Sequence, residues 1–236
     1  MLKKENLILL GIFVFVLILT TVSQFEAKNR LAIYIENGGD KQNTSKEDSG
    51  KKINVPLNKF NKILIRDSAK IRITGGSNYE IICTDKEKLI SNLTMEDDVV
   101  VIFGDSEFLL RANELVSIEV SGKATVNLSD FIADSLFLIC GKQASITASK
   151  CDVRKLNIKS SGISSILYKE TEKNIDTVNI DISEQSLVEL YSDVRTVSGN
   201  ISGEGQFFVE KAGKIEVRTE KNGLRIFNNQ KTIINQ

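Results

Sequence analysis

The C-terminal half of the chain repeats a pattern of about twenty residues. From residue 115 onward, successive segments align with almost no gaps: LVSIEVSGKATVNL, SLFLICGKQASITA, KLNIKSSGISSILY, TVNIDISEQSLVEL, TVSGNISGEGQFFV and KIEVRTEKNGLRIF. A unit this short cannot bury its own apolar face and must stack on its neighbours. The repeat therefore predicts a solenoid.

Stacking these units places apolar residues in columns, with small residues at a corner between two strands. Columns two residues apart lie on the same face of a strand. The first strand supplies Val116, Leu136, Leu156, Val178, Val197 and Ile215, then Ile118, Leu138, Ile158, Ile180, Gly199 and Val217, then Val120, Cys140, Ser160, Ile182, Ile201 and Thr219. The second strand supplies Val126, Ile146, Ile166, Val188, Phe207 and Leu224, then Leu128, Ala148, Tyr168, Leu190, Val209 and Ile226. A weaker third segment supplies Ala133, Val153, Ile175 and Val194.

Two short strands, a tight corner and a third segment describe one coil of a single-stranded parallel β-helix or β-roll. An α-solenoid would need a period of about 3.6 residues, which is not seen. The predicted fold is therefore an all-β solenoid that occupies residues 55–236. Residues 115–236 are expected to form six regular coils, and the less regular residues 55–114 are expected to form atypical coils that cap the stack.

The N-terminus carries an uncharged apolar run from Leu7 to Phe25, preceded by two lysines. As a helix, this run would be about 29 Å long, enough to span a membrane. Residues 1–25 are therefore read as a membrane anchor or signal segment, and the membrane is expected to be contacted through residues 7–25. The alternative to a retained anchor is a cleaved signal peptide, in which the small residues Thr21 and Ser23 occupy positions −3 and −1 of the cleavage site.

Residues 26–54 are interpreted as a flexible polar linker. The stretch ENGGDKQNTSKEDSGKKIN is charged and free of aromatic residues, so burial cannot offset the entropy of ordering it. Together with the anchor, this linker predicts a single-pass protein of the bacterial cell envelope with an extracytoplasmic C-terminal domain. Export after cleavage of the signal segment is the alternative localisation.

Composition argues against several functional classes. The chain has 31 Lys and Arg residues against 31 Asp and Glu residues, and this neutral balance argues against nucleic-acid binding. It has no histidine, so the commonest metal ligand and general base are missing. No catalytic, cofactor-binding or metal-binding residue is predicted. The cysteines Cys83, Cys140 and Cys151 are read as buried apolar residues, and pairing of Cys140 with Cys151 is left open.

Two features of the outward columns stand out. Lys159 and Asp181, on adjacent coils, are expected to form a surface ion pair. Leu167, Leu187 and Phe208 should point outward on the second strand of three successive coils, where a contiguous apolar patch would mark an interface. The alternative is that the insertion 169–174 or the N-terminal segment covers this patch.

The chain also resembles a known family. The stretch FNKILIRDSAKIRITGGSNYEIICTDKEKLISNLTMEDDVVVIFGD, followed by SIEVSGKATVNL and its successors, is similar to the head GIN domain family of autotransporter adhesins. The similarity spans about Val55 to Phe227, and the coil corners here contain less glycine than is usual in that family. The resemblance implies an envelope β-helix with no established catalytic residues.

These observations favour a non-catalytic, membrane-tethered, extracytoplasmic module for binding, adhesion or envelope scaffolding. Its partner, a protein or a surface glycan, cannot be named from the sequence. The first alternative is a self-assembling β-helix similar to bactofilins, whose end coils would stack through unpaired strand edges. The second is a carbohydrate-active enzyme, which would need a cluster of carboxylates on one outward face.

Overall fold

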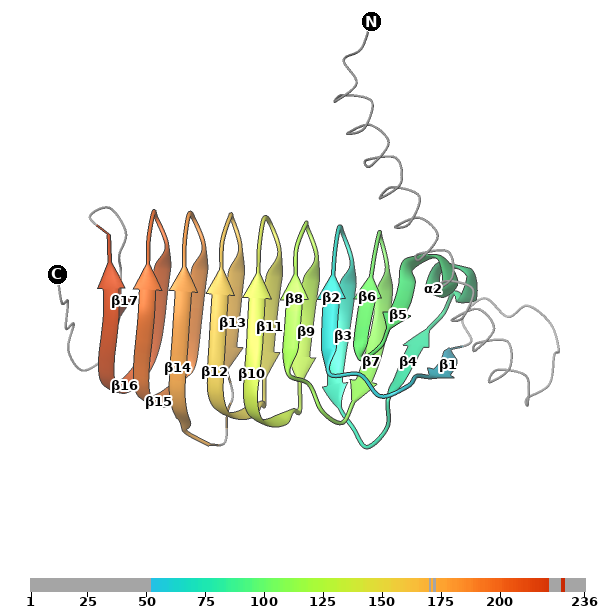
Figure 1. Cartoon of the computed structure of the whole chain (residues 1–236), viewed down its shortest axis with the longest axis horizontal. Coiled ribbons are helices and arrows are strands. Elements are labelled where there is room, and N and C mark those ends of the chain that lie inside the picture. The colour runs from blue at the N-terminus through green and yellow to red at the C-terminus, as the bar shows by residue number, and fades with distance from the viewer. Residues whose placement is uncertain (1–51, 170, 172, 221–225, 228–236) are drawn as a thin grey trace, which may run out of the picture.

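The computed structural model describes residues 52–169, 171 and 173–220, together with the backbone of 226–227. These residues form one solenoid whose coils stack along a single axis (Figure 1). The predicted all-β parallel solenoid is confirmed. The predicted anchor or signal segment 1–25 and nearly all of the predicted linker 26–54 lie outside the described residues.

Each regular coil contributes one strand to each of two parallel ladders. The first strands are β8 (Ser117–Val120), β10 (Ile132–Cys140), β12 (Asp152–Ser160) and β14 (Ile175–Ile182), and the second strands are β9 (Thr125–Ser129), β11 (Ser145–Ser149) and β13 (Ser165–Lys169). The long strands β15 (Leu187–Ile201) and β16 (Gln206–Thr219) bend and serve both ladders in turn, and β17 (Ile226–Phe227) follows. Equivalent strands pair in register from coil to coil, as the repeat predicts.

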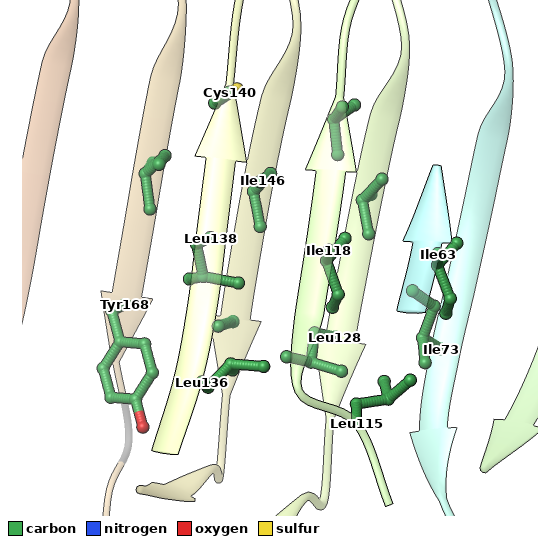
Figure 2. Close-up of a cluster of buried hydrophobic side chains, with 14 of the residues drawn as sticks. Ile63, Ile73, Leu115, Ile118, Leu128, Leu136, Leu138, Cys140, Ile146 and Tyr168 are labelled. Carbon is green, nitrogen blue, oxygen red and sulfur yellow. The ribbon is translucent and has the colours of Figure 1, made fainter. Parts of the chain in front are cut away.

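The predicted columns fill the interior of the solenoid. Ile118 pairs with Leu138, which pairs with Ile158, and all three are buried. Figure 2 shows how side chains from the two ladders meet between the sheets. Gly199 occupies one place in this column because the backbones of two coils approach closely there. Its φ is +135°, and a Cβ atom would collide with the carbonyl oxygen of Ile180.

Two column positions differ from the prediction, one at each end of the regular coils. Val116 is 42% exposed, and Leu115 is buried in its place, because the chain enters β8 from the cap and the Val116 amide donates to the carbonyl oxygen of Asn61. At the other end, Ile226 pairs with Phe207 rather than lying level with Val209, because Ile226 follows Thr219 by one residue more than Phe207 follows Ile201, the partner of Thr219. Leu224 lies outside the described residues.

The corner between the two strands of a coil has one recurrent conformation. Its second residue has a positive φ at each corner that the structure describes: Asp67 (68°), Gly104 (66°), Gly122 (92°), Lys142 (61°), Gly162 (78°), Glu184 (58°) and Gly203 (62°). Two residues later comes a small buried side chain or glycine: Ala69, Ser106, Ala124, Ala144, Ser164, Ser186 or Gly205. The tight corner predicted from small residues is therefore present, although non-glycine residues also adopt the left-handed conformation there.

The N-terminal coils do not stack in chain order. The coil of β2 (Lys62–Ile65) and β3 (Lys70–Gly75) lies between the coil of β6 (Val99–Ile102) and β7 (Glu107–Ala112) and the coil of β8 and β9. The chain thus builds the second coil first, then the end coil, and then passes back to continue the stack (Figure 1).

Antiparallel strands terminate the stack at this end. The strands β5 (Leu93–Glu96) and β4 (Glu80–Cys83) pair antiparallel with β6 and β7, and β1 (Ile53–Pro56) pairs antiparallel with β4. The helix α2 (Lys86–Asn92) connects β4 to β5, and the carboxylate of Asp85 caps it by accepting from the Lys88 amide. The antiparallel strands and α2 therefore close this end of the stack, and the first of these strands begins at Ile53.

All three cysteines are buried free thiols, so Cys140 and Cys151 are not paired. Burial raises the pKa of each of these two thiols to about 11. Tyr168 is fully buried among the columns, and its hydroxyl donates to the carbonyl oxygen of Cys151. Burial likewise raises the pKa of Tyr168 well above its ordinary value.

Candidate binding surfaces

The three residues predicted as an interface all point outward from the second ladder, and each is half-buried. Leu167 is level with Glu189 on the next coil, and Glu189 is level with Phe208 on the coil after that. Leu187 lies two residues before Glu189 in the same strand and is level with Ser165. The structure therefore arranges the three apolar side chains around Glu189 rather than in one row.

Tyr191 extends this group of side chains and was missed at the level of the sequence. Its ring packs on Phe208, with ring centroids 5.0 Å apart, and it is 43% exposed. Its hydroxyl donates to the Glu189 carboxylate over 3.3 Å, and the negative charge of Glu189 raises the pKa of Tyr191. Period-two alternation from Glu189 would have placed Tyr191 outward, but the ladder shifts register between Leu190 and Asp193. We call Leu167, Leu187, Tyr191 and Phe208 the apolar patch.

The insertion after β13 contacts the neighbouring coils. The Thr171 hydroxyl shares a hydrogen bond of 2.9 Å with the Ser192 hydroxyl, and Lys173 forms an ion pair of 3.2 Å with Asp152. The insertion therefore contacts Ser192, which follows Tyr191 of the apolar patch on β15, and Asp152 at the start of β12.

A second candidate surface is a groove at the capped end, on the outer face of β7, β3 and β9. Its floor is a grid of two cross-strand rows. Glu107, Lys70 and Thr125 form one row, and Leu109, Arg72 and Asn127 form the next. We call this hollow, which has a volume of about 490 Å³, the cap groove.

The cap groove exists because β4 leaves the sheet. β4 pairs with β7 only as far as Ile82 opposite Leu109; beyond that point Cys83 pairs with Ile53 of β1, and the chain turns into α2. The ladder between β4 and β7 therefore stops before Glu107, and Ile82, Thr84 and Lys52 form the wall facing the floor. A smaller recess of about 190 Å³ continues from the groove toward the start of α2.

The charges that line the cap groove are mainly positive. Lys52, Lys70 and Arg72 are exposed there, against the one carboxylate of Glu107. Within the part of the chain that the structure describes, neither Lys70 nor Arg72 forms an ion pair. The half-buried side chains of Ile82 and Leu109 supply an apolar strip beside these cations.

Elsewhere, outward charges pair across coils. Lys159 and Asp181 form the predicted surface ion pair, with a distance of 3.8 Å from nitrogen to oxygen. Arg154 bridges Asp134 and Asp176, which also contacts Arg195. Apart from the half-buried Asp176, these side chains are solvent-exposed, so the pairs contribute little to stability.

Neither metal-binding clusters nor membrane-spanning helices occur among the described residues. Among them, no group of three or more Cys, Asp or Glu side chains is arranged to hold a metal ion. Within the same ranges, none of the helices has the length and hydropathy required to cross a membrane. The predicted membrane segment 7–25 lies outside these ranges.

Solved structures with a similar fold include proteins of Bacteroides fragilis and Parabacteroides distasonis. A "putative adhesin" from Bacteroides fragilis has a TM-score of 0.54 and 15% identity, and the match covers 76% of this chain and 98% of that chain. A "putative lipid binding protein" from Parabacteroides distasonis has a TM-score of 0.50 and 12% identity, covering 75% of this chain and 92% of that chain. No protein-family model and no curated protein matches the chain. At such identities, the chain shares with these proteins its solenoid fold.

Proposed function

We propose that this chain is a non-catalytic, extracytoplasmic binding module of the bacterial cell envelope, tethered to the membrane through residues 7–25. The observation that carries the proposal is the apolar patch, which lies on the outer face of the second ladder, over the buried core. The fold likeness to one protein named as an adhesin and one named as a lipid-binding protein supports a binding role.

The composition of the apolar patch suits a binding interface. Aromatic residues are enriched where interfaces bury most surface, and the Tyr191 and Phe208 rings lie in contact. Glu189 at the centre supplies one acceptor that a partner's cation or hydroxyl groups would satisfy. The partner is a protein or a surface glycan that offers an apolar face around a hydrogen-bond donor.

The pairing of outward carboxylates supports a non-catalytic role over a carbohydrate-active enzyme. A glycosidase needs two carboxyl groups about 5 to 9 Å apart and free to act as acid and nucleophile or base. Here Asp134, Asp176, Asp181 and Asp193 are each paired with a lysine or arginine from a neighbouring coil. Such pairing holds the carboxylates in surface ion pairs rather than directing them toward a common point.

A self-assembling filament is the second candidate, and the arrangement of the cap disfavours it. End-to-end stacking requires an unpaired strand at both ends of the stack. At the N-terminal end, β5 and β4 already occupy the outer sides of β6 and β7. A filament of bactofilin type would have to displace both strands.

The test uses the full chain in cells of its own host, with partners captured by residue-specific crosslinking. Leu187→Glu and Phe208→Glu should abolish capture of a partner that the wild type retains. Ile139→Glu is the matched control, since Ile139 is also outward and half-buried but lies on the other ladder. Equal capture by all variants would refute the patch as the binding surface.

Localisation is tested on the same cells. External protease should digest the domain once the outer barrier of the cells is opened and before the cells are lysed. In a second measurement, the intact mass of the purified chain should include residues 1–25. A domain protected until lysis would contradict extracytoplasmic placement. A mass that lacks the first residues would show that this segment is a cleaved signal rather than a retained anchor.

A further inference from the structure

We infer that the cap groove is a ligand site for a single-chain carboxylate amphiphile, a function separate from partner binding at the apolar patch. The groove lies at the capped end of the solenoid, on different strands from the patch. Its volume of about 490 Å³ falls within the range of small-molecule sites.

The shape of the groove follows from the interruption of a ladder. Where β4 separates from β7, Glu107 and Phe108 have no partner on β4, so the edge of β7 opens into the hollow. Ligand sites are concave and combine apolar side chains with a few placed polar groups, and the hollow beside β7 has both. The recess between Thr84 and Glu107 lengthens the hollow toward α2.

The charge of the groove selects an anion. Lys70 has Glu107 beside it in the same row, which offsets one positive charge. Arg72 lies between Leu109 and Asn127, so its guanidinium has an apolar neighbour on one side and an amide on the other. A guanidinium donates two parallel hydrogen bonds to a carboxylate, and Lys52 at the rim adds attraction. Lys52 and Arg72 remain as unbalanced positive charges that attract an anionic head, and the paired donors of Arg72 match the two oxygens of a carboxylate.

The apolar strip beside Arg72 selects the rest of the ligand. Ile82 and Leu109 are paired across the ladder and half-buried, and both lie within one row of the cations. An alkyl chain lying on these two side chains would place its carboxylate at Arg72 and Lys70. A purely polar anion would leave the strip exposed to water, and a neutral alkyl chain would leave the cations unpaired.

The test is photoaffinity labelling of the full chain in zwitterionic nanodiscs. The probe is an eight-carbon alkyl carboxylate with a diazirine on its chain. We expect adducts in the peptides that contain residues 80–84 and 107–111, competed by octanoate. Octylammonium and octyl glucoside, at the same concentration, should not compete. Equal competition by octylammonium would overturn the assignment of an anionic ligand, and stronger competition by octyl phosphate would overturn the choice of a carboxylate.

Variants separate the site from non-specific partitioning. Lys70→Glu with Arg72→Glu should lower labelling of these peptides at least tenfold, and Arg72→Lys should lower it several-fold because it keeps the charge but loses the paired hydrogen bonds. The matched control is Lys62→Glu with Lys123→Glu, two exposed lysines that do not line the groove, one on the coil of β2 and β3 and one on the coil of β8 and β9. Labelling that persists in Lys70→Glu with Arg72→Glu, or falls equally in the control, would refute the site.

The apolar-patch variant Phe208→Glu distinguishes this inference from the proposed function. It should leave groove labelling unchanged while abolishing partner capture. If partner capture fails in the wild type but labelling holds, the groove stands without the proposed function. If labelling of the wild type instead concentrates on β13 and β15, the amphiphile binds the patch and the groove assignment is wrong.

Discussion

The backbone of Gly199 lies directly against the carbonyl group of Ile180 on the preceding coil. A Cβ atom at Gly199 would lie 1.9 Å from that oxygen, and the φ of +135° disfavours any other residue. The two positions are paired across the ladder between β14 and β15, inside the core column. The close spacing of these two coils therefore requires a residue without a side chain at position 199.

Gly199→Ala should lower the free energy of unfolding by about 2–4 kcal/mol, because it adds both a clash and a strained dihedral. Gly141→Ala is the control, since a Cβ atom there would meet only the Ser161 hydroxyl at an ordinary 3.7 Å. Thermal unfolding followed by circular dichroism measures both. Equal stability of the two variants would show that the coil can shift to accept the methyl group.

Tyr168→Phe should cost about 1–3 kcal/mol of stability, because it leaves the buried carbonyl oxygen of Cys151 without its donor. The ring itself stays and keeps the apolar contacts of the column. Tyr191→Phe removes a hydroxyl from an exposed tyrosine and should change stability little. Chemical denaturation of both variants is the measurement, and a neutral Tyr168→Phe would mean that water replaces the lost donor.

Stability should fall as the pH rises above about 9. The pKa of each of the Cys140 and Cys151 thiols rises from 9.0 in the unfolded chain to about 11 in the fold. The folded state thus keeps protons that the unfolded state releases, and unfolding becomes easier across this window by roughly 1.4 kcal/mol per pH unit for each thiol. Denaturation at pH 8, 9 and 10 in reducing buffer tests the slope.

Cys140→Ala with Cys151→Ala should flatten this alkaline slope, although the cavities lower stability at every pH. Tyr168 adds its own loss only at still higher pH, because the pKa of a tyrosine in the unfolded chain is 10.0. An unchanged slope in the double variant would assign the alkaline loss to other groups.

Leu89→Ala should loosen the cap without unfolding the coils. Leu89 is the buried residue of α2, and its truncation would cost about 2–5 kcal/mol if the cap unfolded together with the rest. We expect hydrogen exchange to rise in β5 and β6 well before it rises in β10 to β14. Ile90→Ala, which removes a half-buried side chain from the same helix, is the milder control. Uniform exchange throughout would show that cap and coils unfold as one unit.

The interior of the regular coils could be predicted from the sequence because each coil repeats the same alternation. Ile118, Leu138 and Ile158 occupy equivalent places in equivalent units, and parallel stacking then leaves only one register that buries all of them. The errors fall at Val116 and Ile226, where a coil has a regular neighbour on one side only. There, local chain entry and corner length decide the register instead.

The cap and its groove could not be predicted in the same way. Lys70 and Arg72 alternate with Ile71 and Ile73, so their outward direction is readable from the sequence. Their neighbours Glu107 and Asn127 are distant in the chain and are brought together only because the coil of β2 and β3 lies between two later coils. No repeat marks that order.

The sequence by itself determined the solenoid, its corners and most of its core, because these follow from residue-by-residue alternation and from contacts between identical units. Only the tertiary structure decided the order of the N-terminal coils, the separation of β4 from β7 and the arrangement of the patch around Glu189. Those features depend on contacts between unlike segments far apart in the chain, for which local periodicity carries no information.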